Sequence, residues 1–241
     1  MQIKLLHLYY DLMNLYGEIG NMLILVKYLK EQGFDVTVDK KSIGDTLSFQ
    51  DYTLIYCGSG TESSQKAALT HLLAYKEDLK NAAENGTILL FTGNSFEMLG
   101  KTIFASDGTR YQGIGLSSFE TTETKEIRHT GDAIFHFSEI DTPLVGFINK
   151  CTEIAGITTP LFSVKMGLSN HKGEKSEGFR YQNVFGTHLI GPILVKNPAF
   201  LRYLIELIGS IYDEFTYQQQ SHPYEQKAYE TTLQQLLKRE A

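Results

Sequence analysis

Hydrophobic and polar positions follow two different periods along the first half of the chain. Short apolar runs alternate with segments whose apolar residues recur every three or four positions, which is typical of strands alternating with helices. The expected strands lie at 3–9, 34–38, 52–57 and 87–91, and the expected helices lie at about 19–29 and 63–84. This order predicts an α/β fold with a largely parallel sheet and right-handed crossover connections.

The second half has a different pattern. Short extended runs over 103–119, 126–137 and 145–148 predict antiparallel strands that extend one edge of the sheet. A polar, glycine-punctuated stretch over 167–178 predicts a surface loop. A strand is expected over 183–189, a helix over 198–212 and a polar helix from Pro223 onward. Because no repeat or linker divides the chain, residues 1–241 are expected to form a single domain.

Composition narrows the classes of function. The net charge is −6, with both signs spread along the chain and no basic run that would indicate nucleic-acid binding. The two cysteines, Cys57 and Cys151, are far apart and form no disulfide framework, which favours a reducing cytoplasm. No apolar run reaches the roughly 18 residues of a membrane span. The seven histidines lack the spacing of metal ligands, so neither a metal nor a cofactor is expected.

The stretch from Asn85 to Gly100, which reads NGTILLFTGNSFEMLG, is the most informative part of the chain. It predicts a turn, a buried strand, a sharp bend with a glycine and the start of a helix. That layout holds a nucleophile at the carboxyl edge of an α/β sheet. The stretch resembles the nucleophile region of class I glutamine amidotransferases. The most similar members are the glutaminase subunit of lipid II isoglutaminyl synthase and the amidotransferase domain of cobyric acid synthase.

Further patches of resemblance occur in the family order along nearly the whole chain. They are Asn14-Leu15-Tyr16, Ile19-Gly20-Asn21, Gly58-Ser59-Gly60 with Gln65, Leu99-Gly100-Lys101, Asp107-Gly108-Thr109, Gly113-Ile114-Gly115-Leu116, Arg128 with Thr130-Gly131-Asp132, and the run from Gly186 to Leu194. The resemblance implies the flavodoxin-like class I amidotransferase fold. In this family a thiolate attacks the side-chain amide of glutamine, and a histidine activates the thiol and protonates the departing amine.

The resemblance fails at both catalytic positions. The family motif is Cys-Gly-Gly-Tyr-Gln-Phe/Met-Leu-Gly. When its last two residues are aligned with Leu99-Gly100, Gly93 falls on the cysteine and Glu97 on the glutamine. The family motif Gly-Thr-Tyr-Leu-His-Gly-Pro places Ile190 at the histidine. Glycine has no side chain and isoleucine accepts no proton, so the usual glutaminase step is not supported.

Other residues remain candidates for the site. Ser95 as nucleophile with His188 as base is the rescue alternative, since His188 and Ile190 point to the same face of a strand. In the opposing interpretation Ser95 caps a helix start and His188 is a polar residue near a strand end. Gly58, Ser59 and Gly60 match the loop that supplies an oxyanion-hole amide, and Arg128 matches an arginine linked to holding the glutamine carboxylate.

Three classes of function follow and stay open. The first is a catalytically degenerate amidotransferase subunit that acts with a Mur-ligase-like synthetase on a cell-wall precursor, with cobyric acid-type amidation as its neighbour. The second is an active amidohydrolase that uses Ser95 and His188. The third is a non-catalytic module that binds glutamine or a similar small molecule. Whether the chain is an enzyme is therefore open at this point, and a cytoplasmic location is expected in each case.

Overall fold

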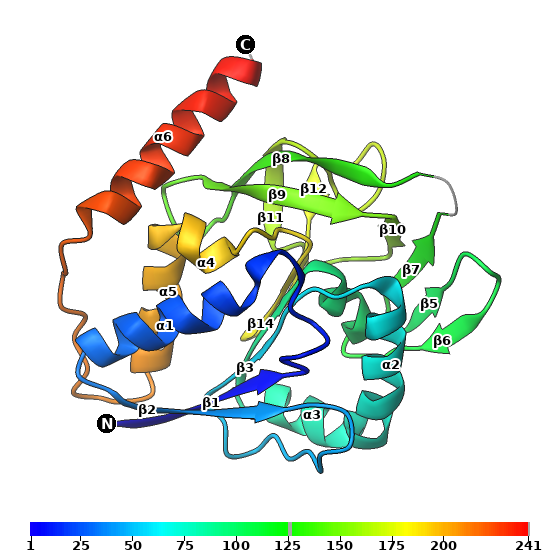
Figure 1. Ribbon diagram of the computed structural model, residues 1–241, viewed down its shortest axis with the longest axis horizontal. Coiled ribbons are helices and arrows are strands. Elements are labelled where there is room, and N and C mark those ends of the chain that lie inside the picture. Colours follow the sequence, from blue (N-terminus) through cyan, green and yellow to red (C-terminus); the bar gives the residue numbers. More distant parts are fainter. Residues whose placement is uncertain (125–126, 241) are drawn as a thin grey trace.

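A computed structural model describes residues 1–124 and 127–240 of the chain (Figure 1). Its main sheet has six strands in the order β13-β14-β4-β3-β1-β2. They are β1 Gln2–Leu8, β2 Asp35–Lys41, β3 Leu54–Cys57, β4 Ile88–Thr92, β13 Phe179–Tyr181 and β14 Val184–Thr187. All neighbours pair in parallel except β13, which is antiparallel to β14. The expected α/β fold with a mainly parallel sheet is therefore confirmed.

Helices cover both faces of this sheet (Figure 1). One face carries α1 Ile19–Glu31, the short α4 Ile193–Lys196 and α5 Pro198–Gly209. The other face carries α2 Glu62–Leu72 and α3 Lys76–Glu84. The single helix expected over 63–84 is interrupted by a 3-10 turn, η2 Leu73–Tyr75, because the backbone of Tyr75 leaves the helical region at φ −117°, ψ 15°.

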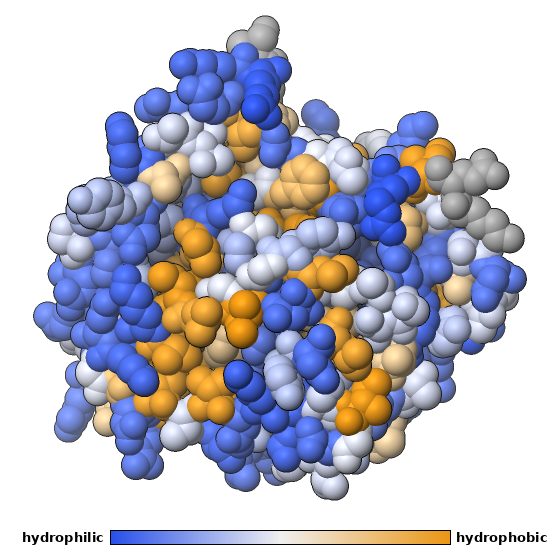
Figure 2. Space-filling model, in the orientation of Figure 1, coloured by the Kyte–Doolittle hydropathy of each residue, from blue (hydrophilic) through white to orange (hydrophobic). Residues whose placement is uncertain are grey.

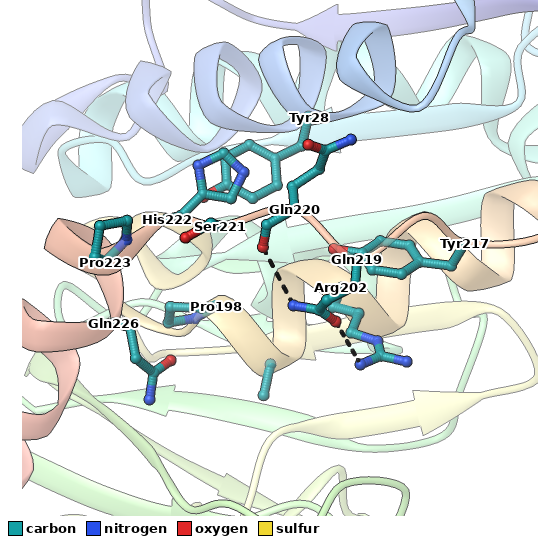
Figure 3. A pocket seen from close by; sticks show the side chains of 11 residues that line it. Tyr28, Pro198, Arg202, Tyr217, Gln219, Gln220, Ser221, His222, Pro223 and Gln226 are labelled. Atoms are coloured by element: carbon teal, nitrogen blue, oxygen red, sulfur yellow. Dashed lines mark hydrogen bonds between the residues drawn. The ribbon is translucent and has the colours of Figure 1, made fainter.

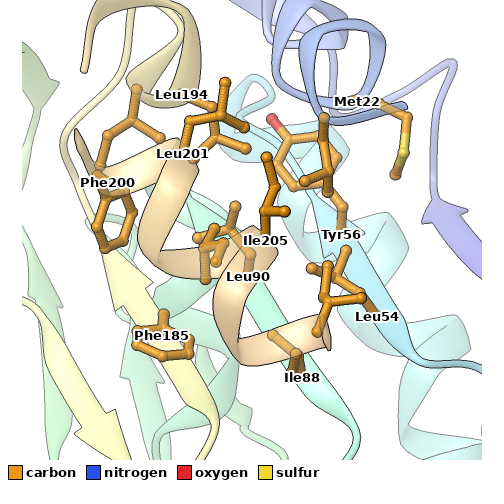
Figure 4. Packing of buried hydrophobic residues seen from close by; sticks show 14 of the residues in the cluster. Met22, Leu54, Tyr56, Ile88, Leu90, Phe185, Leu194, Phe200, Leu201 and Ile205 are labelled. Atoms are coloured by element: carbon orange, nitrogen blue, oxygen red, sulfur yellow. The ribbon is translucent and has the colours of Figure 1, made fainter. Parts of the chain in front are cut away.

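The two-residue period of the strands divides the core into two layers. In β4, Ile88 and Leu90 pack toward α1 and α5, whereas Leu89 and Phe91 pack toward α2 and α3. Figure 4 shows the first layer, in which Leu201 and Ile205 of α5 lie over the strand residues. Burial on both faces explains why the parallel strands read as continuous apolar runs.

Most predicted strands of the second half do not extend the main sheet. One separate sheet has the order β10-β7-β5-β6, and another has the order β12-β11-β8-β9. Their bounds are β5 Thr102–Phe104, β6 Arg110–Gln112, β7 Glu120–Glu123, β8 His129–His136, β9 Leu144–Lys150, β10 Thr152–Ala155, β11 Phe162–Met166 and β12 Ser176–Glu177. Among the described residues, only β13 adds an antiparallel strand to the main sheet, at the edge next to β14. Residue 126 of the predicted run 126–137 lies outside the described residues.

The last helix, α6 Pro223–Glu240, lies against the β8–β9 hairpin rather than against the main sheet (Figure 1). Tyr229 and Leu236 pack on Ile134 and Val145, and the Tyr229 hydroxyl donates to the Pro143 carbonyl at 2.6 Å. Across residues 1–124 and 127–240, no helix is both long enough and apolar enough to cross a bilayer.

Candidate functional site

Gly93 stands at a sharp turn immediately after β4, as the sequence predicts. Its φ of +62° lies in the left-handed region that glycine adopts without steric strain. The chain continues as η3 Gly93–Leu99, which is a 3-10 turn rather than the expected α-helix start. Strand, left-handed residue and helical turn together form the geometry that presents a nucleophile at the carboxyl edge of an α/β sheet.

The two degenerate catalytic positions lie next to each other. A Cβ atom built on Gly93 would be 3.2 Å from Cγ2 of Ile190. The same Cβ would be only 2.3 Å from the Ser59 hydroxyl oxygen and 2.4 Å from the Ser59 Cβ. The Ser59 side chain therefore occupies the volume that a cysteine side chain on residue 93 would need. The sequence pattern placed Ser59 only within the Gly58-Ser59-Gly60 oxyanion-loop motif and gave no sign of this contact with residue 93.

The loop itself is held tightly against the elbow. Asn94 receives a hydrogen bond from the Gly60 amide and donates one to the Gly60 carbonyl, both at 3.0 Å. Cβ atoms on Gly58 and Gly60 would each lie 2.5 Å from an atom of Met13. Both glycines are thus needed for close packing, whatever their role toward a ligand.

Ser95 and His188 occupy structural positions. The Ser95 hydroxyl lies 2.9 Å from the carbonyl of Cys57 and 2.8 Å from that of Thr92, and the side chain is fully buried. The hydroxyl thereby ties η3 to the ends of β3 and β4. Among the residues that the structure describes, no hydrogen bond joins Ser95 to His188. The geometry therefore gives the rescue pair no nucleophile–base contact.

His188 belongs instead to a buried network beneath the elbow. Its Nε2 lies 2.9 Å from Glu97 Oε1, its Nδ1 lies 3.5 Å from Glu177 Oε1, and its backbone amide donates to Glu177 at 2.7 Å. Glu97 also accepts hydrogen bonds from Thr152 and Gln65, both at 2.7 Å. Both oxygens of the Glu97 carboxylate are therefore engaged within the protein, by Gln65, Thr152 and His188.

Burial and pairing act in opposite directions on these groups. Burial by itself would raise the pKa of Glu97, but the hydrogen bond and charge of His188 hold it below its ordinary value. Burial by itself would lower the pKa of His188, but Glu177 and Glu97 hold it above 6.5. Pairing thus favours the charged form of each group against the effect of burial.

Glu177 is the network member that sequence reasoning missed. It is fully buried, and so is Asn170, although both lie in the stretch 167–178 expected to be a surface loop. That expectation is wrong for these residues, because β12 turns Glu177 inward to meet the His188 amide and the Thr187 hydroxyl. The local sequence does not indicate that Glu177 is buried, because a buried polar residue needs a hydrogen-bond partner that can lie far away in the chain.

Glu18 is a second buried carboxylate at the same edge of the sheet that was missed. Its oxygens accept hydrogen bonds from the Tyr56 hydroxyl at 2.9 Å, the Gly191 amide at 3.2 Å and the Thr92 hydroxyl. Burial raises the pKa of Glu18, and these hydrogen bonds offset only part of that effect. Glu18 therefore connects the start of α1 to β3, β4 and the Ile190 loop.

Arg128 lies at the mouth of a crevice that leads toward the elbow. The crevice is lined by Tyr16, Ser59, Gly60, Glu62, Asn94, Glu97, Arg128, Asn149, Lys150, Cys151 and Thr152. Its free volume is only about 10 Å³, close to the minimum for a single water molecule. Arg128, Ser59 and Gly60 thus line one crevice, but side chains fill most of the space between them.

A larger cavity of about 450 Å³ lies elsewhere, between α1, α5 and the segment before α6 (Figure 3). Figure 3 shows Arg202 donating to Gln219 and the His222 ring lying over Tyr28. Tyr28 is near the carboxyl end of α1, roughly 14 Å along the helix from Ile19 at 1.5 Å per residue. This cavity is therefore separate from the elbow and contains none of the predicted site residues.

Comparison with proteins of known sequence places this geometry in context. Residues 4–198 match the CobB/CobQ-like glutamine amidotransferase domain. The chain is 34% identical over 199 residues to the protein named lipid II isoglutaminyl synthase (glutamine-hydrolyzing) subunit GatD of Streptococcus pneumoniae, covering 81% of this chain and 76% of that protein. It is 33% identical over 205 residues to the Staphylococcus aureus protein of the same name, covering 85% of this chain and 84% of that protein.

A solved structure described as a glutamine amidotransferase superposes with a TM-score of 0.57 at 13% identity, covering 85% of this chain and 98% of that one. At that identity the likeness supports the fold alone, and it agrees with the flavodoxin-like class I architecture. The matched domain and the two curated relatives extend over most of the sequence, including the elbow and the Ile190 loop. This chain therefore belongs to the CobB/CobQ-like glutamine amidotransferase family.

Proposed function

We propose that this chain is an amidotransferase-like subunit that does not hydrolyse glutamine and that acts with a Mur-ligase-like synthetase in the amidation of a cell-wall precursor. The observation that carries the proposal is the meeting of Gly93, Ile190 and Ser59 at the elbow. At this point the family's mechanism needs a thiolate and a proton acceptor. This chain has Gly93 in place of the thiolate and Ile190 in place of the proton acceptor. The side chain of Ser59 fills the space beside Gly93.

The names of the relatives support the proposed role in amidation of a cell-wall precursor. Both curated proteins are named as subunits of lipid II isoglutaminyl synthase, and cobyric acid-type amidation is favoured only by the broader name of the matched domain. A chain that lacks its own glutaminase needs ammonia from solution or from another glutaminase. The proposed role here is therefore to support the synthetase by association.

An apolar surface beside the crevice supports association. Tyr16, which lines the crevice, is 45% exposed, and Leu23 one turn beyond Gly20 is 62% exposed. Val195 of α4, which packs near Gly20, is 41% exposed. Figure 2 shows hydrophobic side chains gathered on the face of the molecule where α1 lies. We assign this surface to the synthetase contact.

The activity test uses the purified chain, alone and with the synthetase, and measures glutamate and ammonia release from glutamine. We expect no glutamate above background, while the Streptococcus pneumoniae relative with its own synthetase serves as the positive control. Amidation by the synthetase with ammonium chloride is expected to increase when this chain is added. Glutamine turnover that Ser95→Ala abolishes would instead establish the Ser95–His188 alternative.

The association test compares Leu23→Glu with Ile211→Glu. Ile211 is similarly exposed at 58% but lies after α5, outside the assigned surface. We expect Leu23→Glu to weaken co-elution with the synthetase at least tenfold and Ile211→Glu to leave it unchanged. If both variants co-elute with the synthetase to the same extent, the assignment of this surface is contradicted.

A further inference from the structure

The cavity of about 450 Å³ between α1, α5 and the segment before α6 has no part in the proposed function (Figure 3). Its volume lies within the usual range for small-molecule sites, about 300–1,000 Å³. All of its lining residues except Tyr28 and Pro198 follow residue 198, where the match to the family domain ends. The cavity is therefore built mainly by a part of the chain outside the matched domain.

One wall of the cavity is a guanidinium that other side chains hold in place. The Arg202 guanidinium lies 4.7 Å from the centre of the Tyr217 ring. Its Nε donates to Glu206 at 2.9 Å, and its Nη1 donates to Gln219 at 3.2 Å. The Arg202 side chain is nevertheless 50% exposed and lines the cavity. The protein thus engages one side of this planar group and leaves another side for a ligand.

A second planar group lines the cavity from the direction of α1. The His222 ring stacks on the Tyr28 ring, with their centroids 4.2 Å apart and an angle of 27° between the planes. Its Nε2 lies 3.1 Å from Glu31, and its Nδ1 lies 3.8 Å from Glu225. Figure 3 shows the His222 ring and the Arg202 guanidinium on different sides of the cavity. Two planar groups, each backed by a tyrosine, therefore border the same space.

The remaining polar groups of the lining are carboxamides and a hydroxyl, from Gln219, Gln220, Ser221 and Gln226. Gln219 donates to the Gln220 carbonyl at 3.2 Å, and Gln226 donates to Glu230 at 2.9 Å. Within the described part of the chain, the side-chain carboxamide of Gln220 has no hydrogen-bond partner. A carboxamide carries donors and an acceptor, so it can pair with a ligand edge that presents one of each.

The charges around the cavity favour a neutral ligand. Among the described residues that line it there is no carboxylate, and Arg202 is the one side chain with a permanent charge. That charge is paired with Glu206, and Glu31 and Glu225 lie beside the nitrogens of His222. An anionic ligand would meet a cation that is already paired and carboxylates close by, whereas a cationic ligand would meet the guanidinium.

We propose that this cavity binds the base of a neutral purine nucleoside. The base lies against the Arg202 guanidinium and the His222 ring, since nucleobases stack on both kinds of group in proteins. The Gln220 carboxamide pairs with the edge of the base. Adenine suits it best, because its exocyclic amino group donates and the neighbouring ring nitrogen accepts, which a glutamine side chain matches with two hydrogen bonds. The inference does not depend on the proposed function, because it uses no residue of the elbow.

The binding test is calorimetric titration of the full chain with adenosine, which the wild type is expected to bind. Arg202→Met keeps the length of the side chain but removes the planar guanidinium, so we expect at least a tenfold loss of affinity. Arg110→Met is the matched control and is expected to bind like the wild type. The Arg110 guanidinium also lies over an aromatic ring, that of Phe104 at 5.5 Å, but on β6 in a separate sheet.

The role of Gln220 is tested with purine riboside, which lacks the exocyclic amino group of adenosine. We expect the wild type to bind adenosine at least fivefold more tightly than purine riboside, and Gln220→Ala to bind the two equally. Saturation-transfer difference NMR measures which part of adenosine contacts the protein. The carbon-bound protons of the base are expected to give larger signals than the ribose protons.

Four outcomes would overturn the proposal. The first is a wild type that does not bind adenosine. The second is ribose binding as tightly as adenosine, which would indicate a saccharide site. The third is adenosine monophosphate binding at least tenfold more tightly than adenosine, which would indicate an anion site. The fourth is an equal loss of affinity in Arg202→Met and Arg110→Met when both retain wild-type circular dichroism.

Discussion

The side chain of Ser59 fills the space that any side chain on Gly93 would occupy. The hydroxyl oxygen and Cβ of Ser59 lie 2.3 and 2.4 Å from where a Cβ on Gly93 would be, closer than Cβ atoms approach in real proteins. The absence of a side chain at Gly93 and the position of the Ser59 side chain are therefore linked by packing. Restoring a cysteine without removing the serine produces a steric clash.

We expect Gly93→Cys to destabilise the chain by about 2–5 kcal/mol, from overpacking of about 1–3 kcal/mol plus strain at positive φ of about 1–2 kcal/mol. Adding Ser59→Gly relieves the overpacking part, so the two changes couple favourably by about 1–3 kcal/mol. A double-mutant cycle from urea unfolding measures this coupling. Additive free energies would show that the two side chains do not compete for space.

The triple variant Ser59→Gly, Gly93→Cys, Ile190→His tests whether the elbow still presents a nucleophile. We expect its cysteine to be alkylated by an electrophilic glutamine analogue at least tenfold faster than that of the variant that keeps Ser59. The reason is that only the triple variant has both a free position for the thiol and a base beside it. Intact-protein mass spectrometry follows the labelling. Equal rates in the two variants would argue that Ser59 does not obstruct the site.

The Glu97–His188 pair predicts a defined dependence of stability on pH. The lowered pKa of Glu97 stabilises the fold above its ordinary value of 4.5, and this contribution is lost as pH falls through the folded pKa. The raised pKa of His188 stabilises the fold below 6.5, and this contribution is lost as pH rises through the folded pKa. The pair therefore contributes most between about pH 4.5 and 6.5.

Within that window we expect Glu97→Gln alone to destabilise the chain by about 3 kcal/mol, because it leaves His188 short of one buried carboxylate. Adding His188→Tyr, the residue pattern of the family motifs, should recover a large part of this loss. Chemical unfolding at pH 5.5 and pH 8.5 measures both effects. A wild-type advantage over the double variant that is the same at both pH values would contradict the pair's role.

Ser95→Ala separates the two interpretations of that residue. Because the hydroxyl lies against the carbonyls of Cys57 and Thr92, we expect a loss of about 1 kcal/mol in unfolding free energy, with the two acceptors left short of a donor. Binding of the synthetase should not change. Thermal unfolding and the co-elution assay check these two expectations. An unchanged melting temperature together with a lost activity would favour the catalytic interpretation.

Much of the scaffold was determined by the sequence itself. The apolar run 87–91 followed by Gly93 predicted the strand and the elbow, because a fully buried parallel strand and a left-handed turn both leave local signatures. The degenerate positions Gly93 and Ile190 were placed by motif order, and the structure brings them to contact distance. These features depend on residues close together in the chain, whose period and turn chemistry can be read directly.

The contacts between distant polar residues were decided only by the tertiary structure. Glu177 meets His188 because β12 folds inward from a stretch that is polar in sequence, and Arg128 meets Glu62 across 66 positions. The second-half strands were predicted at the edge of the main sheet, yet most form separate sheets. A local pattern reports which face of an element is buried but not which segment covers it. Packing between segments far apart in the chain therefore decides which residues pair with a buried charge. It also decides which side chain fills the space beside Gly93.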